Sequence, residues 1–263
     1  MLLEIIGVSF ILVLLWICLE FGTRFIGTKN RNKFFANFFK DVPMFYNEKT
    51  GPLKKELFSS LRELQVSSTE LKNRKGIRIL EIGAGSGANM EYYPENTKLT
   101  VVEPNPFFKE HLESTVKKFP GVELERYLIT GAEDMKDIPD HSVDAVVSTS
   151  VLCSANDVQG IYKEIRRVLV PGGRYFFMDH VIDPRPSLLK LTQVFLGSLG
   201  IFQLFLNGCR PDKDIKRELE KGGFAQLDAK QFRLNLKGGV PLRYSVLYFV
   251  LPHIYGSATT ALQ

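Results

Sequence analysis

Cysteine is scarce in this chain of 263 residues, which carries only Cys18, Cys153 and Cys209. Three widely spaced cysteines cannot build the disulfide framework of a small secreted domain, and no C-x-x-C pair offers the spacing of a zinc or redox site. The sequence therefore predicts a protein of a reducing compartment that holds no metal. Its length and its 44% content of hydrophobic residues predict one sizeable globular core.

Positive charge is in slight excess, and that excess is local. The 34 basic and 29 acidic residues leave a net charge of +5. The segment from Phe21 to Lys40 contains basic residues and no acidic one, and without it the chain is neutral. A folded body without net charge argues against a spread nucleic-acid-binding surface. We predict no nucleic-acid partner.

An apolar run without charge opens the chain, from Ile5 to Leu19. As a helix it would measure about 22 Å, short of a hydrocarbon core of about 30 Å, and continuing to Thr23 nearly completes a span. A signal peptide has a similar length, but here the basic residues follow the apolar run and no small-x-small cleavage site ends it. The sequence predicts a retained membrane-anchor helix over residues 1–27, with the body on the cytoplasmic side. Whether this helix spans the bilayer or lies in one leaflet stays open.

An amphipathic segment follows the anchor. The sequence "RNKFFANFFK" places four phenylalanines (Phe34, Phe35, Phe38 and Phe39) on one helical face with cations around it. This face suits either a membrane interface or packing onto the folded domain. The polar stretch from Gln65 to Gly76 marks the best boundary, which divides a membrane-proximal helical region at 28–70 from a folded domain at 71–263.

Strands and helices alternate beyond that boundary. The expected strands are Ile77–Ile82, Leu99–Glu103, Val122–Leu128, Val143–Ser148 and Arg174–Met178. Asn105 before Pro106, and Asn156 with Asp157, are typical starts of the intervening helices. The alternation predicts an α/β fold built on an open, mostly parallel sheet.

The carboxyl-terminal part departs from this alternation. Leu188–Leu206 reads as an apolar helix interrupted by glycines, and Asp212–Lys221 as a charged helix. Phe224–Leu236 and Tyr244–Leu251 read as two closing strands, which predicts an antiparallel edge. The apolar helix suits either a lid over a substrate or ordinary packing on the sheet.

Three glycines follow the first expected strand in "ILEIGAGSGAN". Gly83, Gly85 and Gly87 stand where a strand ends and a helix should begin, so that backbone can approach a ligand closely. Glycine spacing alone also fits a dinucleotide loop, with Glu103 as its ribose acid. Glu81, two places before the first glycine, would repel a pyrophosphate but suits a ligand with a positively charged amino group. Glu103 can accept hydrogen bonds from two vicinal ribose hydroxyls without any phosphate.

Five motifs in this order resemble the class I S-adenosylmethionine-dependent methyltransferases over roughly Ile77 to Leu251. They are "ILEIGAGSGAN", "VVEPNP", "GAEDM", "VDAVVSTSVLCSAND" and "VLVPGGRYFFMDHV". The resemblance implies a Rossmann-like fold and S-adenosylmethionine as the cofactor. It also implies a set of cofactor-binding residues: Glu81, Gly83, Ala84, Gly85, Gly87, Glu103, Pro104, Ala132, Glu133 and Ser150. Gly131 stands where many members carry an aspartate, so the adenine contact passes to Glu133 or to backbone.

The anchor, "EPNP", "VLCS" and the closing "PHIYG" resemble more narrowly the membrane-bound alkyl thiol methyltransferases of the methyltransferase-like seven branch. This resemblance implies methylation of small hydrophobic thiols on the cytoplasmic face of the endoplasmic reticulum or on lipid droplets, with membrane lipid as a further partner. Methylation of a lipid or quinone at oxygen or carbon is the nearest alternative, because those enzymes share most of the motifs. A membrane-docked protein that binds the cofactor without turnover is another.

Candidates for the chemistry follow the later strands. His180, with Asp179, follows the fifth expected strand at the edge where open sheets bind ligands, and we predict that His180 takes or orients the thiol proton. Asp179 and His180 could instead only hold the cofactor pocket. His253 is a second candidate, although a structural histidine also fits there. Cys153 near the same edge is typical of a small packing residue.

Overall fold

The structure is a computed structural model that describes residues 7, 10, 11, 14, 27–64, 66–200, 202, 203, 206–237 and 239–261. Its centre is a seven-stranded sheet in the order β3-β2-β1-β4-β5-β7-β6. The strands are β1 (Ile77–Ile82), β2 (Thr97–Val102), β3 (Val122–Leu128), β4 (Val143–Thr149), β5 (Leu169–His180), β6 (Gln226–Arg233) and β7 (Pro252–Thr259). The first five pair in parallel, and β7 pairs antiparallel with both β5 and β6. The mostly parallel sheet with an antiparallel edge is thus confirmed.

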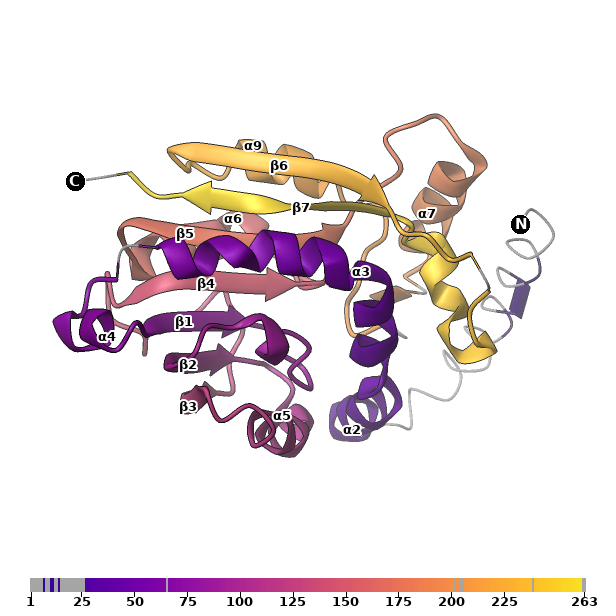
Figure 1. Cartoon of the computed structure of the whole chain (residues 1–263). Coiled ribbons are helices and arrows are strands. Elements are labelled where there is room, and N and C mark those ends of the chain that lie inside the picture. Colours follow the sequence, from indigo (N-terminus) through magenta and orange to yellow (C-terminus); the bar gives the residue numbers. More distant parts are fainter. Residues whose placement is uncertain are drawn as a thin grey trace.

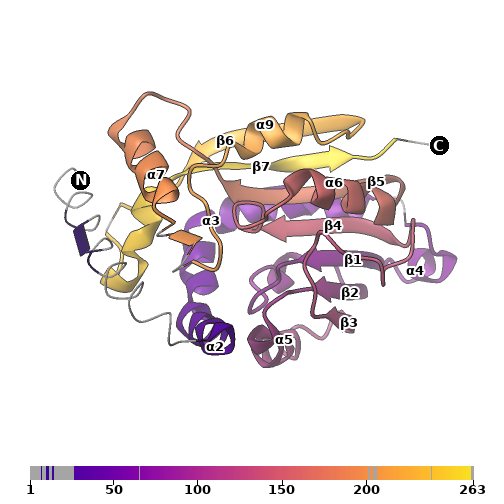
Figure 2. The same ribbon diagram turned by 180° about the vertical axis from the view of Figure 1, so that it is seen from behind.

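Helices cover both faces of this sheet (Figures 1 and 2). The helices of the described residues are α2 (Thr28–Phe39), α3 (Val42–Ser59), α4 (Thr69–Asn73), α5 (Lys109–Val116), α6 (Val158–Val168), α7 (Leu188–Ser198) and α9 (Ile215–Glu220). Short 3₁₀ turns are η1 (Ser60–Glu63), η2 (Met90–Tyr92), η3 (Pro106–Phe108) and η4 (Leu242–Phe249). One buried cluster joins α6 and α9 to one face, and another joins α3 and α5 to the opposite face. The sheet is therefore the middle layer of three.

Local sequence explains several element boundaries. The side chain of Asn105 accepts a hydrogen bond from the N–H of Phe107 at 3.1 Å, and Asp157 accepts one from Gly160 at 2.8 Å, so both expected helix starts are capped as predicted. Helix α7 ends at Ser198, and Gly200 follows with φ +70°. A left-handed residue is a common helix stop, so the helix expected to run to Leu206 ends earlier.

Two expectations about elements were wrong. The glycine loop leads into the three-residue turn η2 and not into a helix. The segment Tyr244–Leu251, expected as a strand, forms most of η4, and the closing strand is β7. Tyr244, Leu247 and Val250 recur every third residue and pack into one buried cluster, which fits a 3₁₀ helix better than the alternation of a strand.

The anchor predicted for residues 1–27 falls almost wholly outside the described residues. Within the part of the chain that the structure describes, no helix is both long enough and apolar enough to cross a bilayer. Helices α2 and α3, in the predicted membrane-proximal region, lie against the sheet and its loops. Phe35 packs edge-on against Phe108, whereas Phe34 is 67% exposed. One part of the phenylalanine face therefore packs on the folded domain, and another part is exposed at the surface.

Candidate active site

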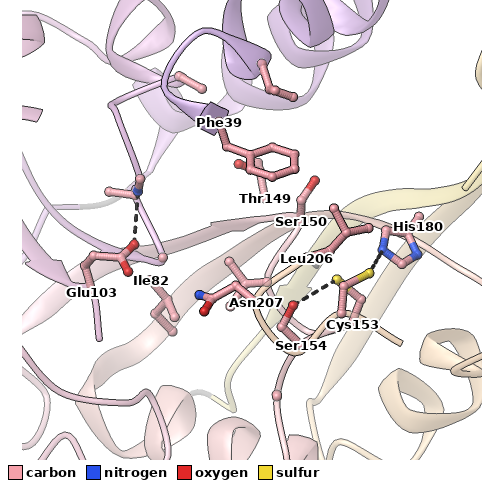
Figure 3. Close-up of a pocket in the computed structure, with 18 of the residues that line it drawn as sticks. Phe39, Ile82, Glu103, Thr149, Ser150, Cys153, Ser154, His180, Leu206 and Asn207 are labelled. Carbon is pink, nitrogen blue, oxygen red and sulfur yellow. Dashed lines mark hydrogen bonds between the residues drawn. The ribbon is translucent and has the colours of Figure 1, made fainter. Parts of the chain in front are cut away.

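A cavity of about 540 Å³ opens at the carboxyl ends of β1, β2, β4 and β5. This edge is where open parallel sheets bind their ligands. The loops after these strands form its floor, and α2, α3 and η4 close it from outside. Figure 3 shows Glu103 at one end of the cavity and Cys153 with His180 at the other. A cavity of this size can hold a cofactor together with a small substrate.

The glycine loop forms one wall of the cavity and needs its glycines. Gly83 and Gly85 have φ +64° and +52°, in the left-handed region that side chains disfavour. A methyl group on Gly83 would lie 2.5 Å from Cγ2 of Val151, whereas one on Gly85 would meet nothing within 4 Å. The N–H of Gly83 donates to the carbonyl oxygen of Val102 at 2.8 Å, which fixes the loop to the end of β2.

Glu103 faces the cavity from the end of β2. Its carboxylate accepts hydrogen bonds from the N–H groups of Gly85, at 3.2 Å, and Asn105, at 2.9 Å. Burial raises the pKa of Glu103, and these two N–H groups oppose the rise. The side chain is therefore held in place by backbone, with oxygen lone pairs left for hydroxyl groups of a ligand.

Eight of the ten predicted cofactor-binding residues line the cavity. They are Gly83, Ala84, Gly85, Glu103, Pro104, Ala132, Glu133 and Ser150. Gly87 does not line it, and a side chain there would crowd Leu112 and Thr115 of α5. Glu81 also lies behind the cavity wall, where its carboxylate accepts a hydrogen bond from Asn89 at 2.7 Å.

Glu81 is one half of a buried pair with Lys54 of α3. Burial raises the pKa of Glu81 to about 7, against the opposing effects of Tyr93, Asn89 and Lys54. Burial likewise lowers the pKa of Lys54 to about 8, although Glu81 favours its charged form. Glu81 therefore acts on the glycine loop through its neighbours, and contact with a ligand amino group stays a prediction.

Helix α3 closes over the glycine loop through polar contacts. Lys54 Nζ donates to the side-chain oxygens of Asn89, at 2.9 Å, and Asn47, at 2.7 Å. Asn47 in turn donates to the carbonyl oxygen of Ala88 at 2.7 Å, and Ser86 donates to that of Lys40 at 2.9 Å. Sequence reasoning missed these residues, because nothing in a single sequence links α3 to a loop more than thirty residues away.

The loop that contains Gly131 borders the cavity beside Glu133. Glu133 accepts a hydrogen bond from the N–H of Asn156 at 3.3 Å, so the loops after β3 and β4 meet here. Ser150, on the loop after β4, has φ +58° and donates its N–H to the carbonyl oxygen of Met178 at 2.8 Å. Contact of Glu133 or of the backbone at Gly131 with the adenine of a cofactor stays a prediction.

The predicted catalytic residues separate into two groups. His180 and His253 line the cavity, whereas Asp179 does not. Side chains alternate along β5, so Asp179 points to the opposite side from His180. Its carboxylate accepts hydrogen bonds from the N–H groups of Val151, at 2.8 Å, and Leu152, at 2.7 Å. Asp179 thus positions the loop after β4.

His253 is fully buried beside the cavity. Its Nδ1 lies 3.0 Å from the carbonyl oxygen of Leu251, and its ring stacks on Phe232 with centroids 5.0 Å apart. Burial lowers the pKa of His253 to about 3, so the ring is neutral at physiological pH. A neutral ring that donates from Nδ1 leaves Nε2 free to accept a hydrogen bond.

His180 meets two cysteines that sequence reasoning did not bring together. Its Nε2 lies 3.1 Å from Sγ of Cys209, and the reactive atoms of His180, Cys153 and Cys209 all lie within 4.8 Å of one another. The Cys153 thiol and the His180 ring stabilise the Cys209 thiolate and lower its pKa to about 6. Cys153, expected as a packing residue, is therefore part of a polar cluster, and Cys209 is an unforeseen member.

Comparisons with known proteins agree with this geometry. A family model described as "Methyltransferase domain" matches residues 80–177. Human thiol S-methyltransferase TMT1A is 33% identical over 226 residues, which cover 86% of each chain. The chain belongs to this family of S-adenosylmethionine-dependent methyltransferases. Rat thiol S-methyltransferase TMT1B is 35% identical to this methyltransferase over 174 residues, which cover 66% of this chain and 68% of the rat chain. The YcgJ protein of Bacillus subtilis has the same fold as this methyltransferase, with a TM-score of 0.51 and 18% sequence identity. The match covers 72% of this chain and 93% of YcgJ.

The cavity of this methyltransferase fits its cofactor. Gly83 and Gly85 leave backbone uncovered at the place that a ligand must approach, and Glu103 presents a buried carboxylate with spare lone pairs. Among the described residues that line the cavity, Lys54 is the only lysine or arginine, and its ammonium is bonded to two asparagines. A site without free cations suits a sulfonium cofactor and does not suit a dinucleotide pyrophosphate.

Proposed function

We propose that this methyltransferase methylates small, lipophilic alkyl thiols at sulfur. The observation that carries the proposal is the apolar wall of the cavity. It consists of Phe35, Phe39, Val42, Leu206, Val246, Leu247 and Val250. A wall of this kind selects a neutral, apolar substrate, because it has no partner for a charged group. The human and rat relatives are named thiol S-methyltransferases, which supports a thiol sulfur as the methylated atom.

The chain's own residues mainly hold and orient the reactants. When bound, the cofactor supplies an electrophilic methyl group on a sulfonium. Glu103 would hold the ribose hydroxyls, and the glycine loop would let the rest of the cofactor approach the backbone. The apolar wall keeps water away and leaves the substrate sulfur little freedom, which can account for much of a rate enhancement. A thiol is far more acidic than the corresponding alcohol, so it needs less help from a base than an alcohol does.

The test is a matched panel of sulfur and oxygen nucleophiles. Detergent-solubilised full-length protein is incubated with labelled S-adenosylmethionine and with hexanethiol, hexanol, thiophenol, phenol and a quinol. We expect product from hexanethiol at a rate well above that from hexanol. Label on the phenol or quinol but on neither thiol would overturn the proposal and favour oxygen or carbon methylation.

We also propose that substrates enter from a membrane, on the cytoplasmic face of the endoplasmic reticulum or on lipid droplets. The support is an apolar surface on α7, where Leu191 is 68% and Phe195 56% exposed. Helices α7 and α2 both lie at the end of the molecule to which the parallel strands point (Figures 1 and 2). Exposed apolar side chains of this kind are typical of membrane contact.

Kinetics with vesicles test this entry route. A Leu191→Glu/Phe195→Glu variant should show a raised KM for a long-chain thiol held in phosphatidylcholine vesicles and an unchanged KM for a short, water-soluble thiol. Leu227→Glu, at a 38% exposed leucine of β6, is the matched control. An equal KM for the vesicle-held thiol in all three proteins would refute entry over α7.

A further inference from the structure

Cys153, His180 and Cys209 converge from three separate parts of the fold. Cys153 lies on the loop after β4, His180 is the last residue of β5, and Cys209 precedes α9. We propose that these three side chains form a zinc site whose fourth position faces the cavity and receives the substrate sulfur. The inference about the fourth ligand rests on the proposed thiol methylation, whereas the three-ligand site does not.

The three side chains have the right chemistry and spacing for zinc. Two cysteines and one histidine are a known ligand set of catalytic zinc sites that keep one position open. Zinc–sulfur bonds of about 2.3 Å and zinc–nitrogen bonds of about 2.0 Å in a tetrahedron place neighbouring ligand atoms roughly 3.5–3.8 Å apart. The three ligand atoms already lie within 4.8 Å of one another, and His180 Nε2 lies 3.1 Å from Cys209 Sγ. Small side-chain movements would therefore suffice to bind the ion.

The backbone around the cluster is fixed independently of any ion. The N–H of Arg210 donates to the carbonyl oxygen of Cys153 at 3.0 Å, which joins the two cysteine-bearing loops. Lys213 donates to the carbonyl oxygens of Leu152, at 3.1 Å, and of Ala155. Asp179 holds the same loop through two N–H groups. Preorganised ligands lower the cost of binding, because little chain entropy is lost when the ion enters.

The charge and the open side of the cluster also suit zinc. Two thiolates and a neutral imidazole together balance the double charge of the ion. Among the described residues, no fourth histidine, cysteine or carboxylate joins the group. All three side chains line the same cavity as Glu103 and the glycine loop. Figure 3 shows Cys153 and His180 at the end of the cavity away from Glu103. The fourth ligand would therefore come from the cavity.

A bound ion would give the chain a means to ionise its substrate. The thiol binds the ion through sulfur, its S–H bond breaks, and the proton leaves to solvent. The thiolate electron pair then forms the new sulfur–carbon bond, while the methyl–sulfur bond of the sulfonium breaks and leaves its pair on the cofactor sulfur. No oxidant or reductant is needed. The neutral thioether product is a weaker ligand than the thiolate, so it can leave.

Metal titration of the full-length protein tests the site. The detergent-solubilised protein is reduced, stripped with a chelator, and titrated with Zn²⁺ against a chromophoric competitor and with Co²⁺ by absorption spectroscopy. We expect one equivalent of Zn²⁺ and a tetrahedral Co²⁺ spectrum with thiolate charge-transfer bands. Cys153→Ser, Cys209→Ser and His180→Gln should each weaken binding at least 100-fold, whereas Cys18→Ser should bind as the parent does. Thermal unfolding shows which variants fold, and the parent's own titration decides the matter if they do not.

The remaining outcomes separate the zinc site from the proposed function. If the reduced parent does not bind one equivalent of Zn²⁺, the zinc site is overturned. A disulfide between Cys153 and Cys209, found by mass mapping of the untreated protein, would then be the role of the two cysteines. Full thiol turnover in chelated protein would overturn its catalytic role and leave thiol methylation standing. A Co²⁺ spectrum that shifts on adding hexanethiol supports the open fourth position, and one that does not shift overturns it.

Discussion

Replacing Glu103 with glutamine should weaken cofactor binding strongly without unfolding the protein. The carboxylate is fixed by the N–H groups of Gly85 and Asn105 and faces the cavity. Glutamine keeps the shape and one acceptor oxygen but turns the other acceptor into a donor. Hydrogen bonds to a charged group contribute about 1.5–3 kcal/mol each, so the loss of one corresponds to roughly 10- to 150-fold in affinity.

Calorimetric titration with S-adenosylhomocysteine measures this loss, since the product shares the ribose and does not react. Glu110→Gln, at an exposed position of α5, is the control and should bind as the parent does. Burial raises the pKa of Glu103, so removal of its charge relieves a desolvation cost, but one of the two backbone N–H groups loses its acceptor. We therefore expect the variant to lose no more than about 1–3 kcal/mol of stability and to remain folded. Unchanged affinity in Glu103→Gln would refute the assignment of the ribose site, and with it the orientation of the cofactor in the cavity.

Three further predictions concern the residues around this site. Gly83→Ala should lower the free energy of unfolding by about 1–3 kcal/mol more than Gly85→Ala, because both changes strain φ but only the first brings a methyl group against Val151. A Val151→Ala change should recover the difference. Equal unfolding midpoints of the two glycine variants in urea would contradict this prediction. Glu81 has a folded pKa of about 7, above its ordinary 4.5, so its stabilising effect is complete below pH 4.5 and is lost as pH rises to 7. The melting temperature of Glu81→Gln should therefore rise relative to that of the parent between pH 5 and 7. A difference in melting temperature that does not change with pH would show that Glu81 does not titrate in this range. Asp179→Ala should cost about 2–4 kcal/mol in urea unfolding, because the N–H groups of Val151 and Leu152 lose their acceptor. A loss below about 0.5 kcal/mol would show that the loop after β4 is held by other contacts.

Local patterns predicted those features whose causes are local. The expected strands Ile77–Ile82 and Val122–Leu128 match β1 and β3 residue for residue. The cap at Asn105 and the turn at Gly83 were also predictable, since each depends on one residue type and its immediate neighbours. The segment Tyr244–Leu251 was mistaken because alternation and three-residue spacing overlap over eight residues, and only burial distinguishes them.

Long-range contacts account for what the sequence did not predict at the site. Cys153, His180 and Cys209 are separated by 27 and 29 residues, so no spacing rule for metal ligands brings them together. Their meeting depends on the order β4-β5-β7 in the sheet and on the return of the chain before α9. The role of Lys54 was equally unpredictable from the sequence. A lysine on a helix is usually exposed, and this one is buried only because α3 packs over the glycine loop.

The burial of Lys54 indicates how the amino-terminal helices contribute to binding. A fully buried ammonium is costly unless its hydrogen bonds are satisfied, and here Asn47 and Asn89 accept them. Asn89 in turn donates to Glu81, so the charge pair is bridged by one amide. Any movement of α3 away from the glycine loop would break the hydrogen bonds of Lys54 to Asn89 and of Asn47 to Ala88 together and leave Glu81 without its cation. The closed roof of the cavity and the conformation of the loop are therefore coupled, which lets the helices before the sheet influence a cofactor site formed mainly by the strands.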